Sequence, residues 1–274
     1  MNASALTDPT HHHSALPDDD ELRETLHNEV HARPSARIRL PALVVSVAVM
    51  NQGVSREDEC AHLQRLPGQA HLTPADLQGN FLRLRFEGHT LKWERHSEFT
   101  RYVLVQPLPA HAGAGAQEPE LLSSLVLEHA WMQAIPGRTV AAVMLVMATH
   151  DLSDPAAALS VGRQWFGGRN VVASMMGNGH SVAITNFRLQ ADGFERILVL
   201  APEDTSETRV GRISQRLLEL EIYRMMALRG LPVAKKLAAD MKEYQAGADQ
   251  CREDFPGSAA IADDVVERLR KALH

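Results

Sequence analysis

Two short segments of this sequence combine histidine with carboxylate or guanidinium groups, the side chains that most often carry acid–base chemistry or bind polar ligands. The first is HNEVHARP at residues 27–34, and the second is WERHSEF at residues 93–99. The sequence has no phosphate-binding P-loop and no dinucleotide fingerprint before a helix. These two segments are therefore the main candidates for a functional site.

The first segment has two histidines at helical spacing. On a helix, His27 and His31 project from one face with Glu24 on the same side, a triplet that could ligate a divalent metal. Metalloprotease helices, however, place a glutamate directly after the first histidine, where this chain has asparagine. The alternative is a helix C-terminus, where His31 and Arg33 complement the helix dipole and Pro34 ends the helix. We predict no metal site and no cofactor.

The second segment has the alternation of a strand. Alternation places Glu94, His96 and Glu98 on one face, opposite Trp93. Two carboxylates that flank an imidazole can raise the pKa of the histidine for acid–base work, or bind a cationic ligand. A solvated polar face of an antiparallel strand has the same pattern, so both interpretations stay open. The candidate ligand-binding residues are His31, Arg33, Trp93, Glu94, His96 and Glu98.

The two segments are predicted to meet through an arginine. The proline after Arg33 biases this residue toward extended geometry, so its guanidinium should project toward the neighbouring sheet. There we expect a partly buried, charge-assisted contact with Glu94 or Glu98. His31 or His96 would line the same pocket. If the pair is a structural latch, the substitution Arg33→Ala costs about 3 to 5 kcal/mol. If it belongs to a ligand site, stability changes little and ligand-induced stabilisation is lost.

Composition excludes several classes of protein. The chain has 274 residues, with 28 Lys and Arg against 34 Asp and Glu, and a net charge of -6 argues against a nucleic-acid partner. Cys60 and Cys251 are far apart, which leaves no disulfide framework or thiolate zinc site. The polar start lacks the apolar stretch of a signal peptide, and no apolar run approaches the ~18 residues of a spanning helix. We expect a cytoplasmic protein without a transmembrane segment.

The elements that must position these residues alternate between strand and helix. The first series is a buried strand over 42–50, a helix over 55–66 with Ser55 as N-cap, and strands over 80–86, 90–96 and 102–106. The second is a helix over about 119–132, a strand over 139–148, a helix over 156–166, and strands over 170–176, 180–189 and 194–200. Asn178-Gly179 predicts a hairpin turn in the second series.

The two series echo each other. Gly88-His89 recurs as Gly179-His180, and the segment 99–105 recurs as 194–200. We therefore predict an α+β fold of internally duplicated strand-helix-strand-strand-strand units with mainly antiparallel sheets, followed by a C-terminal helical region. The predicted domains are a disordered leader over 1–19, a duplicated α+β domain over 20–203 with halves of about 20–115 and 116–203, and a helical region over 204–274.

The C-terminal region is predicted to be helical and to self-associate. Asp204 with Glu207 is typical of a helix start, and Gly230 with Pro232 should bend or end this helix before further segments over 233–245 and 261–273. Its apolar stripe consists of Val210, Ile213, Leu217, Leu220 and Leu228. This stripe predicts a homo-oligomer formed through the C-terminal helix.

Several groups of residues, in order along the chain, resemble the signatures of one bacterial family. They are EVHARP at 29–34, WERH at 93–96, TNFR at 185–188, DGF at 192–194, QRLLE at 215–219 and YRMMAL at 223–228. The chain is similar, over about residues 21–232, to the family called domain of unknown function 3422, described as predicted membrane-anchored proteins. The resemblance implies no known reaction or cofactor. Family members typically continue into two C-terminal transmembrane helices that this chain lacks, so we expect a short or truncated relative that meets the membrane only through a partner.

Two functions are consistent with these observations. The first is a cytoplasmic sensor or scaffold module without an assignable reaction. The alternative is an enzyme or small-ligand binder, hydrolytic or acid–base, that uses a His/Glu/Arg pocket. This pocket would lie between the first predicted helix, which starts after Asp20 and runs through His31, and the strand at 93–99. The sequence identifies neither the ligand nor the physiological partner.

Overall fold

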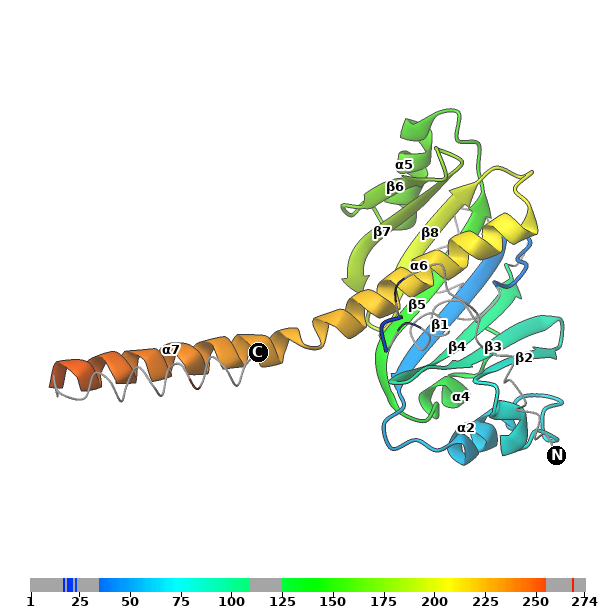
Figure 1. Cartoon of the computed structure of the whole chain (residues 1–274). Helices are drawn as coiled ribbons and strands as arrows, with labels where there is room; N and C mark the ends of the chain where they lie inside the picture. Colours follow the sequence, from blue (N-terminus) through cyan, green and yellow to red (C-terminus); the bar gives the residue numbers. More distant parts are fainter. Residues whose placement is uncertain are drawn as a thin grey trace, which may run out of the picture.

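The computed structural model describes residues 17, 19–21, 23, 35–108, 125–254 and 268. Its centre is one eight-stranded sheet with the strand order β2-β3-β4-β1-β5-β8-β7-β6 (Figure 1). The strands are β1 (Ala42–Met50), β2 (Phe81–Phe86), β3 (His89–Arg95), β4 (Phe99–Pro107), β5 (Arg138–Thr149), β6 (Val172–Met176), β7 (Ser181–Leu189) and β8 (Glu195–Ala201). The helices are α2 (Arg56–Leu63), the 3-10 helix η1 (Pro74–Leu77), α4 (His129–Gln133), α5 (Pro155–Trp165), α6 (Glu207–Leu228) and α7 (Leu231–Asp254).

Helices cover both faces of the sheet. The long helix α6 crosses one face, and α2, α4 and α5 lie against the other (Figure 1). In the central strand β1, Leu43 and Val45 enter the core beside α2, α4 and α5, whereas Ala42 and Val44 enter the core beneath α6. Burial on both faces explains why this strand is an almost continuous apolar run.

The strand order is mirrored about β1 and β5, but the strand directions are not. The two sequence echoes fall at equivalent places, because Gly88 and Gly179 lie in the hairpin turns β2–β3 and β6–β7. However, β4 runs antiparallel to β1, whereas β8 runs parallel to β5. A simple two-fold axis would keep these relations the same. The α+β class and the mainly antiparallel sheet are confirmed, and the internal duplication is not confirmed.

Local signals in the sequence form as predicted at two places. The Ser55 side chain accepts a hydrogen bond from the Asp58 backbone N–H at 3.1 Å, and the Asp58 carboxylate accepts one from the Ser55 backbone N–H at 3.0 Å. This reciprocal pair is a capping box at the start of α2. Asn178 and Gly179 both have positive φ, at 58° and 85°, as a two-residue hairpin turn between β6 and β7 requires.

Two predicted helix starts are wrong. Residues 125–128 are not helical, and α4 is a single turn whose Trp131 is buried in the core. The helix α6 begins after Ser206 rather than Asp204, because the backbone N–H of Thr205 bonds to the Pro202 carbonyl and holds this segment in a turn. The predicted leader over 1–19 and segment over 261–273 lie, apart from residues 17, 19 and 268, outside the described residues.

The helix α6 uses most of its apolar stripe within the chain. Val210 is buried and Ile213 and Leu217 pack beside it, whereas Leu220 is 67% exposed. At Gly211 the helix passes so close to the backbone of Ala36 that a Cβ would lie 1.7 Å from its carbonyl oxygen. The helix α7 then projects away from the sheet (Figure 1). None of the described helices combines the length and the apolar character that crossing a membrane would need.

Candidate functional site

The residues predicted on β3 leave opposite faces of the sheet, and both are buried. Trp93 has no exposed surface and packs in the core beside α2 and α4. Glu94 also has no exposed surface, because its face of β3 lies under α6. Glu94 therefore does not belong to a solvated polar face.

Glu94 is the anion of a buried charge cluster. Its carboxylate pairs with the Lys92 ammonium at 2.9 Å and accepts a hydrogen bond from Arg101 Nε at 2.5 Å. Burial favours the protonated acid, but the charges of Arg101 and Lys92 outweigh it and hold the pKa of Glu94 below its usual range. Burial lowers the pKa of Lys92, and Glu94 opposes that shift. The cluster fixes β3 to β4 beneath α6, which is a structural role.

The other two candidates of this segment lie beyond the end of the strand. The His96 ring stacks on Phe99 with centroids 4.2 Å apart, and it lies perpendicular to the ring of Tyr223 of α6 with centroids 6.5 Å apart. His96 is only 7% exposed, whereas Glu98 is exposed in the turn before β4. The imidazole therefore helps to seat α6 on the sheet.

His31 and Arg33 lie outside the described residues, so their predicted contact with Glu94 or Glu98 stays a prediction. Ala36, three residues after Arg33, is described, and it lines a small cavity together with Lys92 and Arg101. Among the described residues, no group of three or more His, Cys, Asp or Glu side chains is placed to hold a metal ion.

Two further cavities lie among the described residues of the other half of the sheet. One is a groove of about 650 Å³ between α6 and the strands β6, β7 and β8, which we call the arginine groove. Its floor consists of alternate residues of the three strands, among them Met176, Ala183 and Ile197, and its wall includes Ile213 and Leu217 of α6. These side chains make an apolar surface large enough for a small ligand.

One rim of the arginine groove is positively charged. Arg209, Arg212 and Arg216 follow one another at i, i+3 and i+7 on α6, so their side chains share one face of the helix. All three are exposed, and Arg209 reaches the Gly177 carbonyl at 3.5 Å. Within the described part of the chain, neither Arg212 nor Arg216 pairs with a carboxylate. This rim can bind an anion.

A pair of carboxyl groups lies further along the groove. Burial and the neighbouring charge of Glu221 raise the pKa of Glu195 to about 7, and the two side chains share a hydrogen bond. Arg224 pairs with Glu221 at 2.6 Å. At neutral pH Glu195 is therefore only partly ionised.

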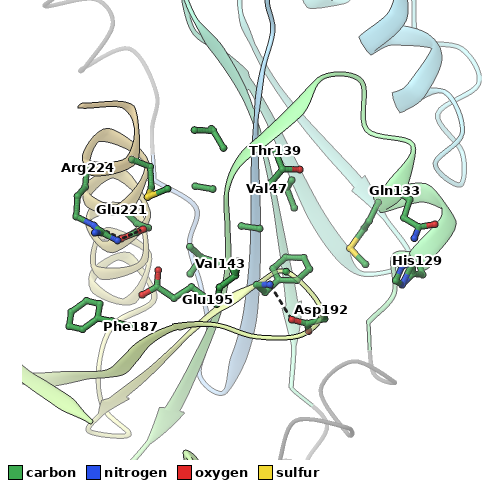
Figure 2. A pocket seen from close by; sticks show the side chains of 18 residues that line it. Val47, His129, Gln133, Thr139, Val143, Phe187, Asp192, Glu195, Glu221 and Arg224 are labelled. Carbon is green, nitrogen blue, oxygen red and sulfur yellow. Dashed lines mark hydrogen bonds and ion pairs between the residues drawn. The ribbon is translucent and has the colours of Figure 1, made fainter. Parts of the chain in front are cut away.

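These two glutamates also line a second cavity of about 600 Å³, which we call the edge cavity (Figure 2). It runs along residues 139–143 of β5. Figure 2 shows Glu221 and Arg224 entering from α6, and His129 and Gln133 entering from α4. The two cavities therefore meet at Glu195 and Glu221.

Sequence reasoning missed both cavities. The arginines at 209, 212 and 216 carry a usable signal, since they share a helix face and have no acidic residue at the i±4 positions that would pair with them. Glu195 and Glu221 carry none, because they meet only when α6 crosses the sheet.

A mixed eight-stranded sheet with one long covering helix and two cavities defines an α+β protein with the means to bind a ligand. The chain belongs to the family described as protein of unknown function (DUF3422), whose model matches residues 18–272. No curated protein and no solved structure matches it.

Proposed function

We propose that this protein is a sensor module that binds an amphiphilic anion in the arginine groove. The observation that supports this most directly is the row of three arginines on the rim, two of them without a carboxylate partner among the described residues, above an apolar floor. Guanidinium groups match the geometry of carboxylate and phosphate oxygens, so the head group binds at the rim. An alkyl or aromatic body lies on Met176, Ala183 and Ile197.

The far end of the groove orients the ligand. Glu195, which is partly ionised at neutral pH, lies beside the carboxyl group of Glu221, and their negative charge repels a second anionic group. An anion with a single charged end therefore lies with its head beside Arg212 and Arg216. The proposed ligand class is a fatty acid or alkyl phosphate rather than a dicarboxylate.

The groove is placed to report binding to the rest of the chain. One wall is α6 and the floor is β6 to β8, so a ligand that contacts both holds the helix against the sheet. After Arg229 and Gly230, α6 is followed by α7, which projects away from the sheet (Figure 1). Ligand binding changes how α6 packs against the sheet, and α7 transmits this change to a partner, including one at a membrane.

The test uses decyl phosphate as probe, below its micelle concentration, with decanol and inorganic phosphate as controls. Isothermal titration should detect decyl phosphate, with both controls at least about tenfold weaker. The double variant Arg212→Ala/Arg216→Ala should lose about tenfold or more in affinity. The matched double variant Arg83→Ala/Arg85→Ala removes the same charge from exposed positions on β2 and should bind normally. Equal binding by the two double variants, or no binding of decyl phosphate, contradicts the proposal.

We also propose that α7 mediates self-association, because it carries exposed apolar side chains on one side. Val233, Leu237 and Tyr244 are 60%, 44% and 63% exposed, and their spacing of four and seven residues places them on one stripe. Light scattering after size exclusion should show an oligomer that Val233→Gln/Leu237→Gln converts to a monomer. The control Lys235→Gln/Lys242→Gln introduces the same residues on the opposite face. A monomeric native chain at high concentration contradicts this proposal.

A further inference from the structure

The edge cavity lies beside a stretch of β5 that has a strand on only one side. Residues Arg138–Met147 of β5 pair with β1 along nearly their whole length. On the other side, the pairing with β8 begins only at Val143, opposite Glu195. Residues 138–142 of β5 therefore have no strand partner among the described residues on the side away from β1, next to the turn that joins β7 to β8. We call this stretch the open edge of β5.

This open edge leaves backbone groups without a partner from the described residues. In a strand, alternate residues direct their N–H and C=O groups to the same side. None of the described backbone hydrogen bonds outside the regular strand pairs and helices involves residues 138–142. The edge cavity follows the same residues and holds about 600 Å³. A row of backbone groups that no described residue pairs, beside a cavity lined by described residues, is a template for another strand.

Both sides of the slot are walled. Ala141 and Ala142 point to opposite faces of the sheet, and their small side chains leave room in the cavity. On one face lie Glu195 and Glu221, and on the other lie His129 and Gln133 of α4 (Figure 2). Met132 of α4 also lines the cavity. A strand placed here would direct alternate side chains to the wall that carries Glu195 and Glu221 and to the wall where Met132 lies beside His129 and Gln133.

We propose that the edge cavity binds an extended peptide segment of a partner protein, which adds to β5 as a short strand and places a lysine or arginine against Glu195 and Glu221. Five residues of strand span about 17 Å, the length of the open edge. Main-chain hydrogen bonds to residues 138–142 supply affinity, and the alternation of basic and apolar side chains supplies specificity. The peptide site shares Glu195 and Glu221 with the arginine groove but none of the three arginines Arg209, Arg212 and Arg216, so variants can test the two sites separately.

The first test measures the edge without any peptide. Hydrogen exchange on the full chain should show that amides within 138–142 that face the cavity exchange fast, whereas amides of 143–147 are protected on both sides. Protection of the whole stretch in the free protein would mean that another part of the chain or a second copy already occupies the slot. That outcome overturns the proposal.

The second test uses the capped peptide acetyl-Val-Lys-Val-Lys-Val-amide as probe. It should bind and slow exchange within 138–142, and acetyl-Val-Glu-Val-Glu-Val-amide should bind at least about tenfold more weakly. Two further versions carry N-methyl groups on alternate sets of residues. Only the set that faces β5 matters for pairing, so one version should lose binding and the other should keep it. No binding of the lysine peptide up to about 1 mM, or equal binding of both N-methyl versions, overturns the proposal.

Variants separate this site from the arginine groove. Glu195→Gln/Glu221→Gln should weaken the lysine peptide about tenfold, whereas Arg212→Ala/Arg216→Ala should leave it unchanged. The control Glu98→Gln removes an exposed carboxylate elsewhere. Full affinity in the double glutamate variant overturns the charge assignment. Failure of decyl phosphate to bind, with normal peptide binding, would contradict only the groove proposal.

Discussion

The substitution Glu94→Gln should destabilise the protein more than the loss of any exposed carboxylate. Glu94 is the anion between two nearly buried cations, since the side chains of Lys92 and Arg101 are 5% and 4% exposed. Glutamine has nearly the same shape and keeps an oxygen that accepts hydrogen bonds. The change therefore removes charge and little else.

The magnitude follows from two opposing quantities. At 2.9 Å and an effective dielectric constant of about 20, the attraction between Lys92 and Glu94 is about 6 kcal/mol. Desolvation costs several kcal/mol for each ion, so the intact cluster contributes little net stability. Without Glu94 the desolvation of both cations is no longer compensated, and we expect a loss of about 3 to 5 kcal/mol in the free energy of unfolding. Lys92→Met should cost much less, about 1 kcal/mol at most, because the Glu94–Arg101 pair remains intact.

Urea unfolding followed by Trp fluorescence and far-ultraviolet circular dichroism measures these differences. The pKa of Glu94 is lowered in the folded state, so its contribution is present above the unfolded pKa and is lost as pH falls through the folded value. The difference in the free energy of unfolding between the native chain and Glu94→Gln should therefore become smaller as pH falls. The control is Glu98→Gln, at an exposed carboxylate. A loss below about 1 kcal/mol for Glu94→Gln, or an equal loss for Glu98→Gln, would refute the reasoning.

Three further predictions concern packing and titration. Gly211→Ala should destabilise the protein by about 1 to 3 kcal/mol, because the added Cβ meets the Ala36 carbonyl. The control Gly247→Ala in α7 has no neighbour within 4 Å and should leave stability unchanged, and thermal unfolding compares the two variants. Burial and, to a smaller extent, the charge of Arg65 lower the pKa of His62 to about 4. The unfolded chain therefore binds a proton that the folded chain does not, and the free energy of unfolding falls as pH drops below 6.5. Between about pH 7 and pH 5, His62→Phe should lose less stability than the native chain. The pKa of Glu195 is raised to about 7, so the stability that this group contributes at low pH is lost as pH rises through that value. At about pH 8, Glu195→Gln should therefore unfold at a higher temperature than the native chain. An equal or lower unfolding temperature contradicts this.

The parts of the fold that depend on neighbouring residues could be predicted from the sequence. Ser55 and Asp58 cap α2 across three residues, and Asn178-Gly179 forms its turn from local backbone preference. The opposite orientation of Trp93 and Glu94 follows from the period of two in a strand. The hairpin between β3 and β4 also places Arg101 directly opposite Glu94, so this ion pair was within reach of a register argument.

The parts that depend on distant elements could not be predicted. A charged residue in a strand is normally solvated, and only the passage of α6 over β3 buries Glu94. The direction of β8 relative to β5 depends on α5, β6 and β7, which lie between them in the chain. The two halves have similar local sequence patterns, yet β4 is antiparallel to β1 whereas β8 is parallel to β5. The open edge of β5 lies in the same place, where the parallel pairing with β8 begins only at Val143. The feature that carries the peptide proposal thus arises where the apparent repeat breaks down.

The shared position of Glu195 allows one titration to test both proposals at once. Glu221 and Arg224 face it from α6, and Asp192 and His129 line the same edge cavity. A cationic peptide in the edge cavity lowers the pKa of Glu195, so binding should release protons and tighten as pH rises through about 7.

An anion in the arginine groove raises the same pKa, so its binding should take up protons and weaken as pH rises. Titration calorimetry in two buffers with different ionisation enthalpies measures the sign for each probe. The proton transfer of the lysine peptide should disappear in Glu195→Gln and persist in Glu98→Gln. Decyl phosphate also titrates by itself at about pH 6, so for this probe the part that depends on Glu195 is the difference between the native chain and Glu195→Gln. A Glu195-dependent proton transfer of the same sign for the lysine peptide and decyl phosphate would contradict the placement of Glu195 beside both ligands, because opposite charges shift the pKa of one carboxyl group in opposite directions.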